Sequence, residues 1–390
     1  RVVKLEQNYR STQVILDAAN GIIAKNANRQ DKRLWTEKEG GDKIRHWLAD
    51  NERHEGQLIA QEIQRYLIGS EYPHYKDFVV LYRTNAQSRT IEEVFLSHGI
   101  PYKIIGGTKF YERKEIKDIL AYLRVLVNPN DSVSLMRIIN VPSRKIGAKT
   151  LEAVRSFALR NNLSMFNAML LADEIEEVSG SKAQAIESFV KLIKELQIAN
   201  QEFPASGMIK MVLSKSGYKK MLNDGSVEGE ARLENISELV SVANKYDKLE
   251  ASMSLKIFLE EVSLIADIDT LDETDNAVTL MTVHGAKGLE FPNVFISGLE
   301  EGIFPHNRSL LDREELEEER RLMYVAMTRA KENLYLIHSR RRLLYGEAKS
   351  NAPSQFLADI DASLVEANFG GHGARMHISV SDIGNKPIPI

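Results

Sequence analysis

An arginine beside a tyrosine stands at the start of a predicted helix near the beginning of the chain. The segment LEQNYRST, residues 5–12, follows a short strand-like run over residues 2–5 and precedes the apolar positions of a helix. In open α/β sheets, ligands bind where a strand gives way to a helix, and the first turn of a helix attracts anions. Arg10 therefore suits a phosphate, and Tyr9 suits a stacked base. The segment equally fits a plainer interpretation, in which a hydroxyl residue caps the helix, Arg10 lies on the surface and Tyr9 packs.

A second segment, TLMTVHGAKGLEF over residues 279–291, places two glycines and a carboxylate directly after an apolar run. Gly285 and Gly288 permit close approach of the backbone to a phosphate or a sugar, and Glu290 can accept a hydrogen bond from a ribose hydroxyl. A glycine-rich turn after a strand also occurs without any ligand. A lone histidine such as His284 is equally at home as a structural residue.

A third segment, EEERRLMYVAMTRAK over residues 317–331, is mostly an ordinary solvated helix face, because its glutamates meet arginines three and four positions later. Arg329 differs. It lies about 120° from Met323 around the helix, off the apolar stripe, and just before the strand-like run Leu334 to Ile337. A guanidinium there suits the stabilisation of a transferring phosphate, unless it pairs with a local carboxylate such as Glu332.

Two clusters of predicted strands must position these residues. Phe78 to Tyr82 and Val278 to Val283 are nearly continuous apolar runs, typical of parallel strands covered by helices on both faces. Between the clusters, from about Thr108 to Asp275, the apolar residues recur at helical spacing only. We expect an α/β fold with a large inserted all-helical domain, so that both halves of the chain meet in one sheet. The other strand-like runs are Tyr102 to Ile105, Val294 to Ile296 and Leu334 to Ile337.

The composition excludes several classes of protein. With 43% hydrophobic and 27% charged residues among 390, the chain is neither disordered nor built to span a membrane. It has no cysteine, which excludes disulfides and thiolate chemistry and fits a reducing cytoplasm. The net charge of -4 gives no global basic field, so any site for a polyanion must be local. The chain begins at Arg1 without a signal pattern, and we expect it to be part of something longer.

Taken in order, LEQNYRST, FVVLYRTNAQSR, TLMTVHGAKGLEF, EEGIFPHNRSL and EEERRLMYVAMTRAK closely resemble the carboxyl-terminal half of superfamily 1 DNA helicases of the PcrA/UvrD/Rep group, nearest its PcrA members. The resemblance covers roughly Val2 to Leu357, including FYERKEIKDILAYLRV in the helical insertion. It implies a discontinuous second RecA-like motor domain over residues 1–107 and 276–345 and an inserted helical accessory domain over 108–275. Residues 346–390 would form a partly mobile C-terminal extension.

The resemblance also implies a nucleotide site. Arg10 and Arg329 would reach the γ-phosphate of ATP, Tyr9 would stack on adenine, and Glu290 would meet the ribose beside Gly288. No G-x-x-x-x-G-K-[ST] loop occurs in the sequence, so the Mg²⁺ ligands are expected on a separate amino-terminal motor domain. We expect no metal site in this chain and interpret the acidic segment 272–275 as a linker. The fragment alone would then be inactive as an ATPase.

Two regions are candidates for DNA contact. The resemblance places single-stranded DNA across the face formed by residues after the strands, where a loop can grip a phosphate backbone and a ring can stack on a base. Each residue alone is also an ordinary exposed polar side chain or a half-buried tyrosine. These candidates are Arg83, Thr84, Asn85, Arg89, His284, His306, Asn307 and Tyr345.

The second region is the turn PSRKIGAKT, residues 142–150, in the helical insertion. It gathers Arg144, Lys145 and Lys149 around Gly147, an arrangement that suits non-specific binding of duplex phosphates. A polar helix cap explains the same residues equally well. The resemblance favours contact with duplex DNA.

The function implied by the resemblance is that of an ATP-dependent DNA helicase in DNA repair or replication. It would translocate 3′ to 5′ on single-stranded DNA and unwind duplex, with the amino-terminal motor domain of the same protein and repair or transcription proteins as partners. The alternative is a non-catalytic DNA- or protein-binding module without an ATPase of its own. The missing phosphate loop favours the module, whereas Tyr9, Arg10, Glu290 and Arg329 favour half of a motor.

Overall fold

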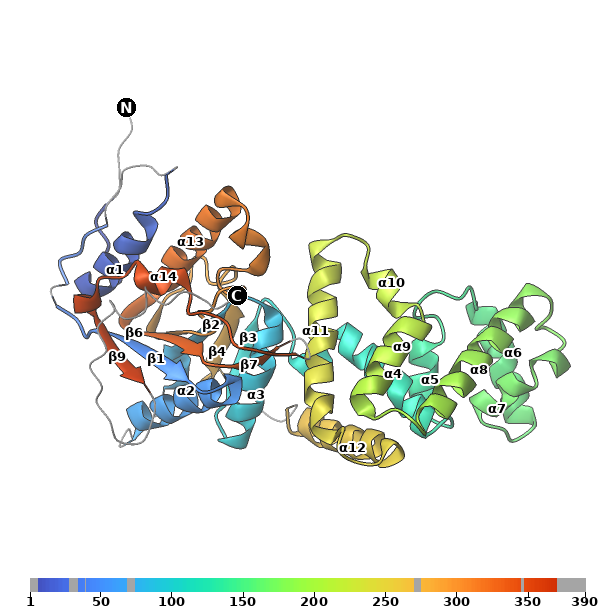
Figure 1. Cartoon of the computed structure of the whole chain (residues 1–390). Coiled ribbons are helices and arrows are strands. Elements are labelled where there is room, and N and C mark those ends of the chain that lie inside the picture. Colours follow the sequence, from blue (N-terminus) through green and yellow to red (C-terminus); the bar gives the residue numbers. More distant parts are fainter. Residues whose placement is uncertain are drawn as a thin grey trace, which may run out of the picture. The chain divides into compact units, whose positions relative to one another are not determined.

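A computed structural model describes residues 6–27, 34–38, 40–68, 74–269, 275–344 and 347–369. The chain divides into two compact units (Figure 1). The sheet unit comprises the described residues within 1–109, 271–343 and 348–390. The helical unit comprises those within 110–270 and 344–347.

One parallel sheet organises the sheet unit. Its strand order is β3-β4-β2-β5-β6-β1-β9, and every neighbouring pair is parallel. β2 pairs directly with β4, which confirms that the two sequence halves meet in one sheet and that the fold is α/β. The seven strands are β1 (Ile44–Ala49), β2 (Phe78–Tyr82), β3 (Tyr102–Ile105), β4 (Val278–Thr282), β5 (Phe291–Ile296), β6 (Ala330–Ser339) and β9 (Val365–Phe369); β7 (Arg342–Leu344) and β8 (Glu347–Lys349) pair separately.

Helices cover both faces of this sheet, which explains the continuous apolar strands. Val79 and Leu81 pack on the face that carries α1 (Gln13–Ile23), α13 (Arg313–Met327) and α14 (Gln355–Ala358). Val80 and Tyr82 pack on the opposite face, which carries α2 (Glu52–Leu67) and α3 (Ser88–Ser97). Because successive side chains of a strand point to opposite faces, both faces of β2 must be apolar.

The helical unit is built around α4 (Lys114–Val127), which contacts α5, α8, α9, α11 and α12. Ile116, Ile119, Leu120 and Leu123 of α4 are buried, as their helical spacing predicts. The other helices of this unit are α5 (Ser132–Ile138), α6 (Ala148–Arg160), α7 (Met165–Leu170), α8 (Ser181–Ala199), α9 (Ala205–Lys215), α10 (Tyr218–Leu222), α11 (Val227–Ala243) and α12 (Ala251–Asp269).

Two strands of the sheet are absent from the sequence-based expectation. β1 carries Arg45 and His46, which interrupt an apolar run, and the structure provides both with partners inside the fold. β9 belongs to the segment 346–390 that was expected to be an extension. In the described part of that segment, β9 pairs with β1 and completes one edge of the sheet. The predicted strand over residues 2–5 and the tail after residue 369 lie outside the described residues.

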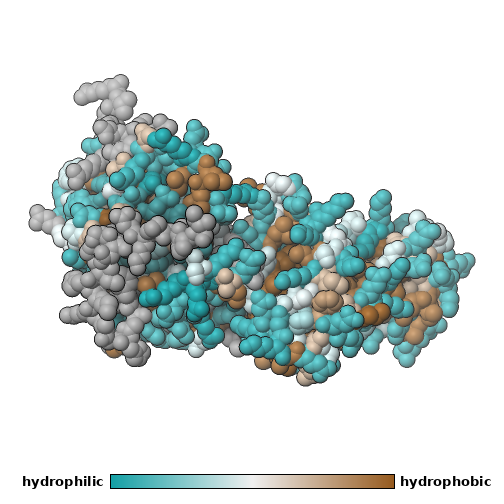
Figure 2. All heavy atoms as spheres, in the orientation of Figure 1, coloured by the Kyte–Doolittle hydropathy of each residue, from teal (hydrophilic) through white to brown (hydrophobic). Residues whose placement is uncertain are grey.

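The described surface in Figure 2 is mostly hydrophilic, with apolar residues in small separate patches. Among the described helices, none is long and apolar enough to cross a membrane.

Candidate nucleotide and DNA sites

Three residues expected at a nucleotide site meet at the amino-terminal edge of the sheet. Glu290 directly precedes β5 and Arg329 directly precedes β6, and the amide of Phe291 donates to the carbonyl of Arg329 at 3.0 Å. Arg10 Nε donates to Glu290 Oε2 at 2.6 Å, and Arg10 Nη1 donates to the carbonyl of Thr328 at 3.2 Å. Open α/β sheets usually bind ligands at the carboxyl ends of their strands. This cluster lies at the other, amino-terminal edge.

The main chain around Arg10 is held by its neighbours. Asn8 Oδ1 accepts from the amides of Arg10 and Ser11, at 2.8 and 2.9 Å. The buried Ser11 hydroxyl donates to the carbonyl of Ala330 at 2.6 Å, so it ties this segment to the start of β6. Thr12 occupies the N-cap of α1 without a side-chain cap bond. Ser11 thus fixes the Arg10 segment against β6, and the Thr12 side chain does not cap the helix.

Arg329 is half-buried and donates to main-chain carbonyls at both sides of its loop. Its Nε reaches the carbonyl of Val325 and its Nη1 the carbonyl of Leu289, each at 3.0 Å. Burial first, and then the charge of Arg10, lower the pKa of Arg329. Because a guanidinium stays protonated in proteins, this proximity leaves positive charge that an anion would relieve.

Lys331 also belongs to this cluster, although the sequence motif gave it no role. Its Nζ lies 2.7 Å from Glu290 Oε1. The hydrogen bond from Lys331 and then that from Arg10 lower the pKa of Glu290 to about 2. Lys331 is the second residue of β6, next to the turn that carries Arg329, and this proximity in sequence was the available signal. Three cations against one carboxylate give an edge suited to a polyphosphate.

The remaining expected nucleotide residues are exposed at their predicted positions. Tyr9 is 74% exposed, and its hydroxyl donates to Gln7 Oε1 at 2.7 Å. Gly288 has φ +89°, a left-handed conformation that favours glycine, within the turn leading to β5. The exposed ring of Tyr9 suits stacking on a planar base.

The predicted DNA-contact residues gather at the carboxyl-terminal edge of the same sheet. Because all strands are parallel, the residues that follow them meet at one edge, opposite Arg10 and Arg329. The two expected sites therefore lie at opposite edges. Arg83, Thr84 and Asn85 follow β2, His284 follows β4, and His306 and Asn307 follow β5.

Arg83 is held by a carboxylate that sequence inspection assigned to a helix face. Glu319 of α13 accepts from Arg83 Nε at 3.0 Å and from Nη2 at 2.7 Å. The same carboxylate accepts from the amide of His306 at 3.0 Å. Partial burial and then the charge of Arg83 lower the pKa of His284. Glu319 therefore joins two of the predicted DNA-contact loops.

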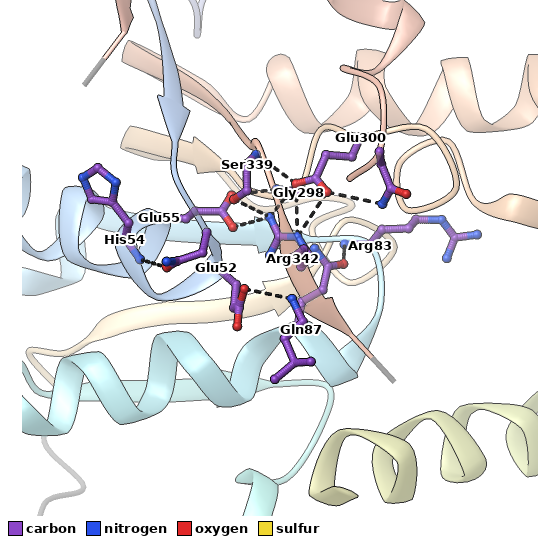
Figure 3. A network of polar contacts seen from close by, with 12 residues as sticks. Glu52, His54, Glu55, Arg83, Gln87, Gly298, Glu300, Ser339 and Arg342 are labelled. Atoms are coloured by element: carbon purple, nitrogen blue, oxygen red, sulfur yellow. Dashed lines mark hydrogen bonds and ion pairs between the residues drawn. The ribbon is translucent and has the colours of Figure 1, made fainter. Parts of the chain in front are cut away.

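A buried ion network lies behind this edge (Figure 3). Arg342 Nη2 lies 2.5 Å from Glu55 Oε2 and 2.7 Å from Glu300 Oε1. The amide of Gly298 donates to Glu55 Oε1 at 2.8 Å, and the amide of Ser339 donates to Glu300 Oε1 at 2.9 Å. Burial, opposed by Arg342, raises the pKa of Glu55. One guanidinium thus fastens α2 and the connections that leave β5 and β6.

Gln87 packs against Gly298 of this network and holds the main chain at Arg83. Its Oε1 accepts from the amides of Arg83 and Thr84, at 3.0 and 2.9 Å. A Cβ at Gly298 would come within 2.2 Å of Gln87 Nε2, so the close approach requires glycine there. In Figure 3 the side chain of Arg83 extends away from Arg342. Gln87 therefore fixes the main chain of the turn after β2, while the Arg83 side chain points away from the buried ion network.

Arg89 differs from its expected role. It lies on α3 rather than in the loop after β2, and it is 4% exposed. Its Nη1 donates to Glu93 at 2.8 Å and its Nη2 to Thr90 at 3.0 Å. A guanidinium buried and paired in this way braces α3 and leaves little surface for a DNA backbone. Tyr345 lies outside the described residues.

Arg144, in the turn of the helical unit, also has an internal role. Its Nη1 donates to the carbonyls of Ile138, Ile139 and Pro142 at 2.9 to 3.2 Å, and its Nη2 donates to the hydroxyl of Tyr122 at 2.6 Å. These bonds give the carbonyls of Ile139 and Pro142, in the connection after α5, a side-chain donor and add a second donor to the carbonyl of Ile138. Arg144 therefore supports the turn, and the phosphate contact expected of it stays a prediction.

The other residues of the same turn remain on the surface. Lys145 and Lys149 are exposed, and Lys145 has φ 61°, uncommon for a residue other than glycine. Gly147 is the exposed N-cap of α6, whose first amides lack helical partners. Two lysines beside open amides keep the character of a phosphate-binding turn.

In the part of the chain that the structure describes, no three His, Asp or Glu side chains are grouped so as to hold a metal ion. Residues 272–274 of the acidic segment lie outside that part.

Comparison with known proteins identifies relatives along almost the whole chain. The UvrD-like helicase C-terminal domain profile matches residues 3–341. The ATP-dependent DNA helicase PcrA of Bacillus subtilis is 48% identical over 372 residues, which cover 94% of this chain and 50% of the relative. PcrA of Staphylococcus epidermidis is 48% identical over 377 residues (95% and 51%), and PcrA of Staphylococcus aureus is 49% identical over 374 (94% and 50%). The chain spans about half the length of these relatives.

Proposed function

Since the chain belongs to the UvrD-like helicase C-terminal domain family, we propose that it forms the second motor domain and the helical accessory domain of an ATP-dependent DNA helicase. The sheet unit would be the motor domain and the helical unit the accessory domain. The other motor domain would come from the amino-terminal part of the same protein.

In this proposal, Arg10 and Arg329 face the γ-phosphate of ATP bound between the two motor domains. Negative charge spreads over the γ-phosphoryl oxygens during transfer, and a guanidinium supplies fixed donors for those oxygens. Lys331 adds a third cation, and Tyr9 stacks on the adenine. Glu290 orders Arg10 and Lys331 and keeps further lone pairs for a ribose hydroxyl.

The phosphate loop and the Mg²⁺ ligands belong to the amino-terminal motor domain. Because the sequence contains no G-x-x-x-x-G-K-[ST] loop, the chain alone would not hydrolyse ATP. Mg²⁺ would neutralise charge on the β- and γ-phosphates, and the arginines of this chain would complete the site from the other side.

The carboxyl-terminal edge would hold single-stranded DNA through Arg83, His284 and the loop of His306. The turn with Lys145, Gly147 and Lys149 would touch duplex phosphates without reading sequence. Movement would run 3′ to 5′ and unwind duplex ahead of it. Repair or transcription proteins in the cytoplasm are the further partners that we propose.

The observation that carries this proposal is the cluster of Arg10, Glu290 and Arg329, drawn from three distant segments to one edge of the sheet. The test compares ATP hydrolysis by this chain alone and by the intact two-motor protein, each with and without single-stranded DNA. We expect turnover only in the intact protein, with stimulation by DNA. An intact protein that hydrolyses ATP at the same rate without DNA would contradict the proposal.

A non-catalytic DNA- or protein-binding module remains the second candidate, favoured by the missing phosphate loop. It predicts that the longer protein binds DNA through this chain and hydrolyses no ATP under any condition. The same assay therefore separates the two functions.

A further inference from the structure

One carboxylate joins two connections at the carboxyl-terminal edge of the sheet. The Glu319 side chain is only 4% exposed, and it accepts from Arg83 on the loop after β2 and from the amide of His306 on the connection after β5. A bidentate pair of this kind fixes the plane of the guanidinium as well as its position. Arg83 thus has its rotamer set before any ligand arrives.

This arrangement prepares Arg83 for a second anion. Glu319 engages Nε and Nη2, so the guanidinium retains donors on Nη1 for a phosphate oxygen. The Arg83 side chain keeps 19% of its surface exposed. Ordering a long side chain costs rotamer entropy, and the pair with Glu319 has already met that cost.

The same helix reaches the opposite edge of the sheet. Arg329 lies two residues beyond the end of α13, and the eight helical steps from Glu319 to Met327 span about 12 Å at 1.5 Å rise per residue. Met323, Ala326 and Met327 between them are buried against the sheet, which limits bending of α13. The bond from Arg329 Nε to the carbonyl of Val325 fastens the arginine to the last turn. A shift of α13 at Glu319 therefore moves Arg329 as well.

We propose that Glu319 is a positioning residue that couples DNA binding at Arg83 to ATP turnover at Arg329, an inference that rests on the proposed helicase function. A phosphate bound at Arg83 weakens its hydrogen bonds to Glu319, so that α13 shifts. Because Arg329 is hydrogen-bonded to the last turn of α13, it then moves relative to the γ-phosphate. The coupling needs the Glu319 charge and its reach, and Glu319 touches neither DNA nor nucleotide.

The test is a double-mutant cycle in the intact two-motor protein. The maximal ATP turnover stimulated by single-stranded DNA is measured for the wild type, Glu319→Gln, Arg83→Ala and the double variant. We expect Glu319→Gln to lower the stimulated rate roughly tenfold or more, because a displaced Arg329 stabilises the transition state less well. The double variant should match Arg83→Ala, because Glu319 acts through that arginine. Single effects that multiply in the double variant, or a normal rate in Glu319→Gln, would overturn the inference.

Glu314→Gln is the matched control. Glu314 lies on the same helix, in the first turn of α13, and its side chain is exposed, so its replacement should leave the stimulated rate unchanged. If Glu319→Gln lowers the melting temperature strongly, Glu319→Asp replaces it in the cycle: it keeps the charge and shortens the reach. A normal stimulated rate in Glu319→Asp would also overturn the inference. A wild type without DNA-stimulated turnover would instead refute the proposed function.

Discussion

Arg10 Nε lies 2.6 Å from Glu290 Oε2, although 280 residues separate the two in the sequence. Lys331 holds the other oxygen of the same carboxylate at 2.7 Å. Glu290 therefore holds two cations close together that would otherwise repel each other. In the proposed helicase this carboxylate has two tasks, ordering the phosphate-binding cations and meeting the ribose.

Glu290→Gln should weaken ATP binding more than it weakens folding. The change weakens two contacts proposed for bound ATP, the acceptor for the ribose hydroxyl and the ordering of Lys331, and we expect the KM for ATP of the intact protein to rise roughly tenfold, about 1.4 kcal/mol. The melting temperature should hardly move, because exposed ion pairs contribute about 0 to 1 kcal/mol. Steady-state kinetics measures the change. Glu332→Gln, at an exposed neighbouring residue, is the control, and an equal KM in both variants would argue against this role.

The alternation of apolar strands and helical spacing predicted the sheet and the helical insertion, because both depend on local periodicity. β1 escaped prediction because Arg45 and His46 look unfit for a buried strand. Their partners lie on other elements: Glu62 on α2 is 17 residues from Arg45, and His338 on β6 is 292 residues from His46. Long-range pairing of this kind leaves no local signal.

The candidate site shows the same division. The motifs located Arg10, Glu290 and Arg83 at sheet edges, but nothing local distinguishes these arginines from Arg89 or Arg144. Arg89 donates to the carboxylate of Glu93, and Arg144 donates to main-chain carbonyls at and after the end of α5. Whether an arginine faces solvent or the interior is decided by packing, which a single sequence does not reveal.

The turn over residues 142–150 should separate stability from DNA binding. Arg144→Ala removes four hydrogen bonds from a charged donor, so we expect a loss of about 2 to 3 kcal/mol in the free energy of unfolding. Lys145→Ala with Lys149→Ala should change it by less than about 0.5 kcal/mol. Urea denaturation of the chain measures both.

The affinity for duplex DNA should depend more on Lys145 and Lys149 than on Arg144. Replacing the two lysines should weaken binding for any DNA sequence and reduce the salt slope by up to about 0.9 for each lost phosphate contact. Titration of labelled duplex at several salt concentrations gives the slope. An unchanged slope would mean that this turn serves only as a helix cap.

A pair of histidines should make the sheet sensitive to mild acid. His46 Nε2 and His338 Nδ1 lie 3.0 Å apart between β1 and β6. Burial and then His338 lower the pKa of His46 to about 3, and burial lowers the pKa of His338 to about 4 despite Glu300 nearby. The unfolded chain takes up these protons near pH 6.5, whereas the folded chain resists. Stability is therefore full above pH 6.5 and falls as the pH drops toward 4, by a few kcal/mol.

His46→Asn should flatten this dependence by removing one titrating ring. The measurement is the urea midpoint of the chain between pH 7 and pH 4. The exposed His74 provides the control, and His74→Asn should keep the full slope. Equal slopes in the two variants would show that other groups carry the acid sensitivity.

Removing Arg342 should destabilise the sheet unit severely. Glu55 and Glu300 are each 1% exposed or less and share this one guanidinium. Arg342→Met leaves two buried carboxylates without their counter-ion, which costs about 3 to 5 kcal/mol. Adding Glu55→Gln and Glu300→Gln removes those charges and should restore part of the loss. Arg340→Met, at a 61% exposed side chain, is the control. Urea denaturation that shows no recovery in the triple variant would point to lost packing instead.

Arg10 and Arg329 are the residues on which the proposed chemistry depends most. Burial, and then the like charge of Arg10, lower the pKa of the half-buried Arg329. Such an arrangement is unfavourable for folding unless a ligand between them uses both charges. A supplied arginine contributes about 10³ to 10⁵ in phosphoryl-transfer rate.

Arg10→Ala and Arg329→Ala should each lower DNA-stimulated ATP turnover of the intact protein by orders of magnitude while nucleotide affinity changes little. A group that meets charge only in the transition state alters the rate and not the ground-state binding. Arg329 also donates to the carbonyls of Val325 and Leu289, so its loss carries a stability term. Arg329→Lys separates the two effects, because a lysine keeps the charge but lacks the planar fork that grips two oxygens at once. If Arg329→Lys turns over ATP almost normally, or Arg329→Ala fails only because it unfolds at the assay temperature, Arg329 is a structural residue of the α13 to β6 connection.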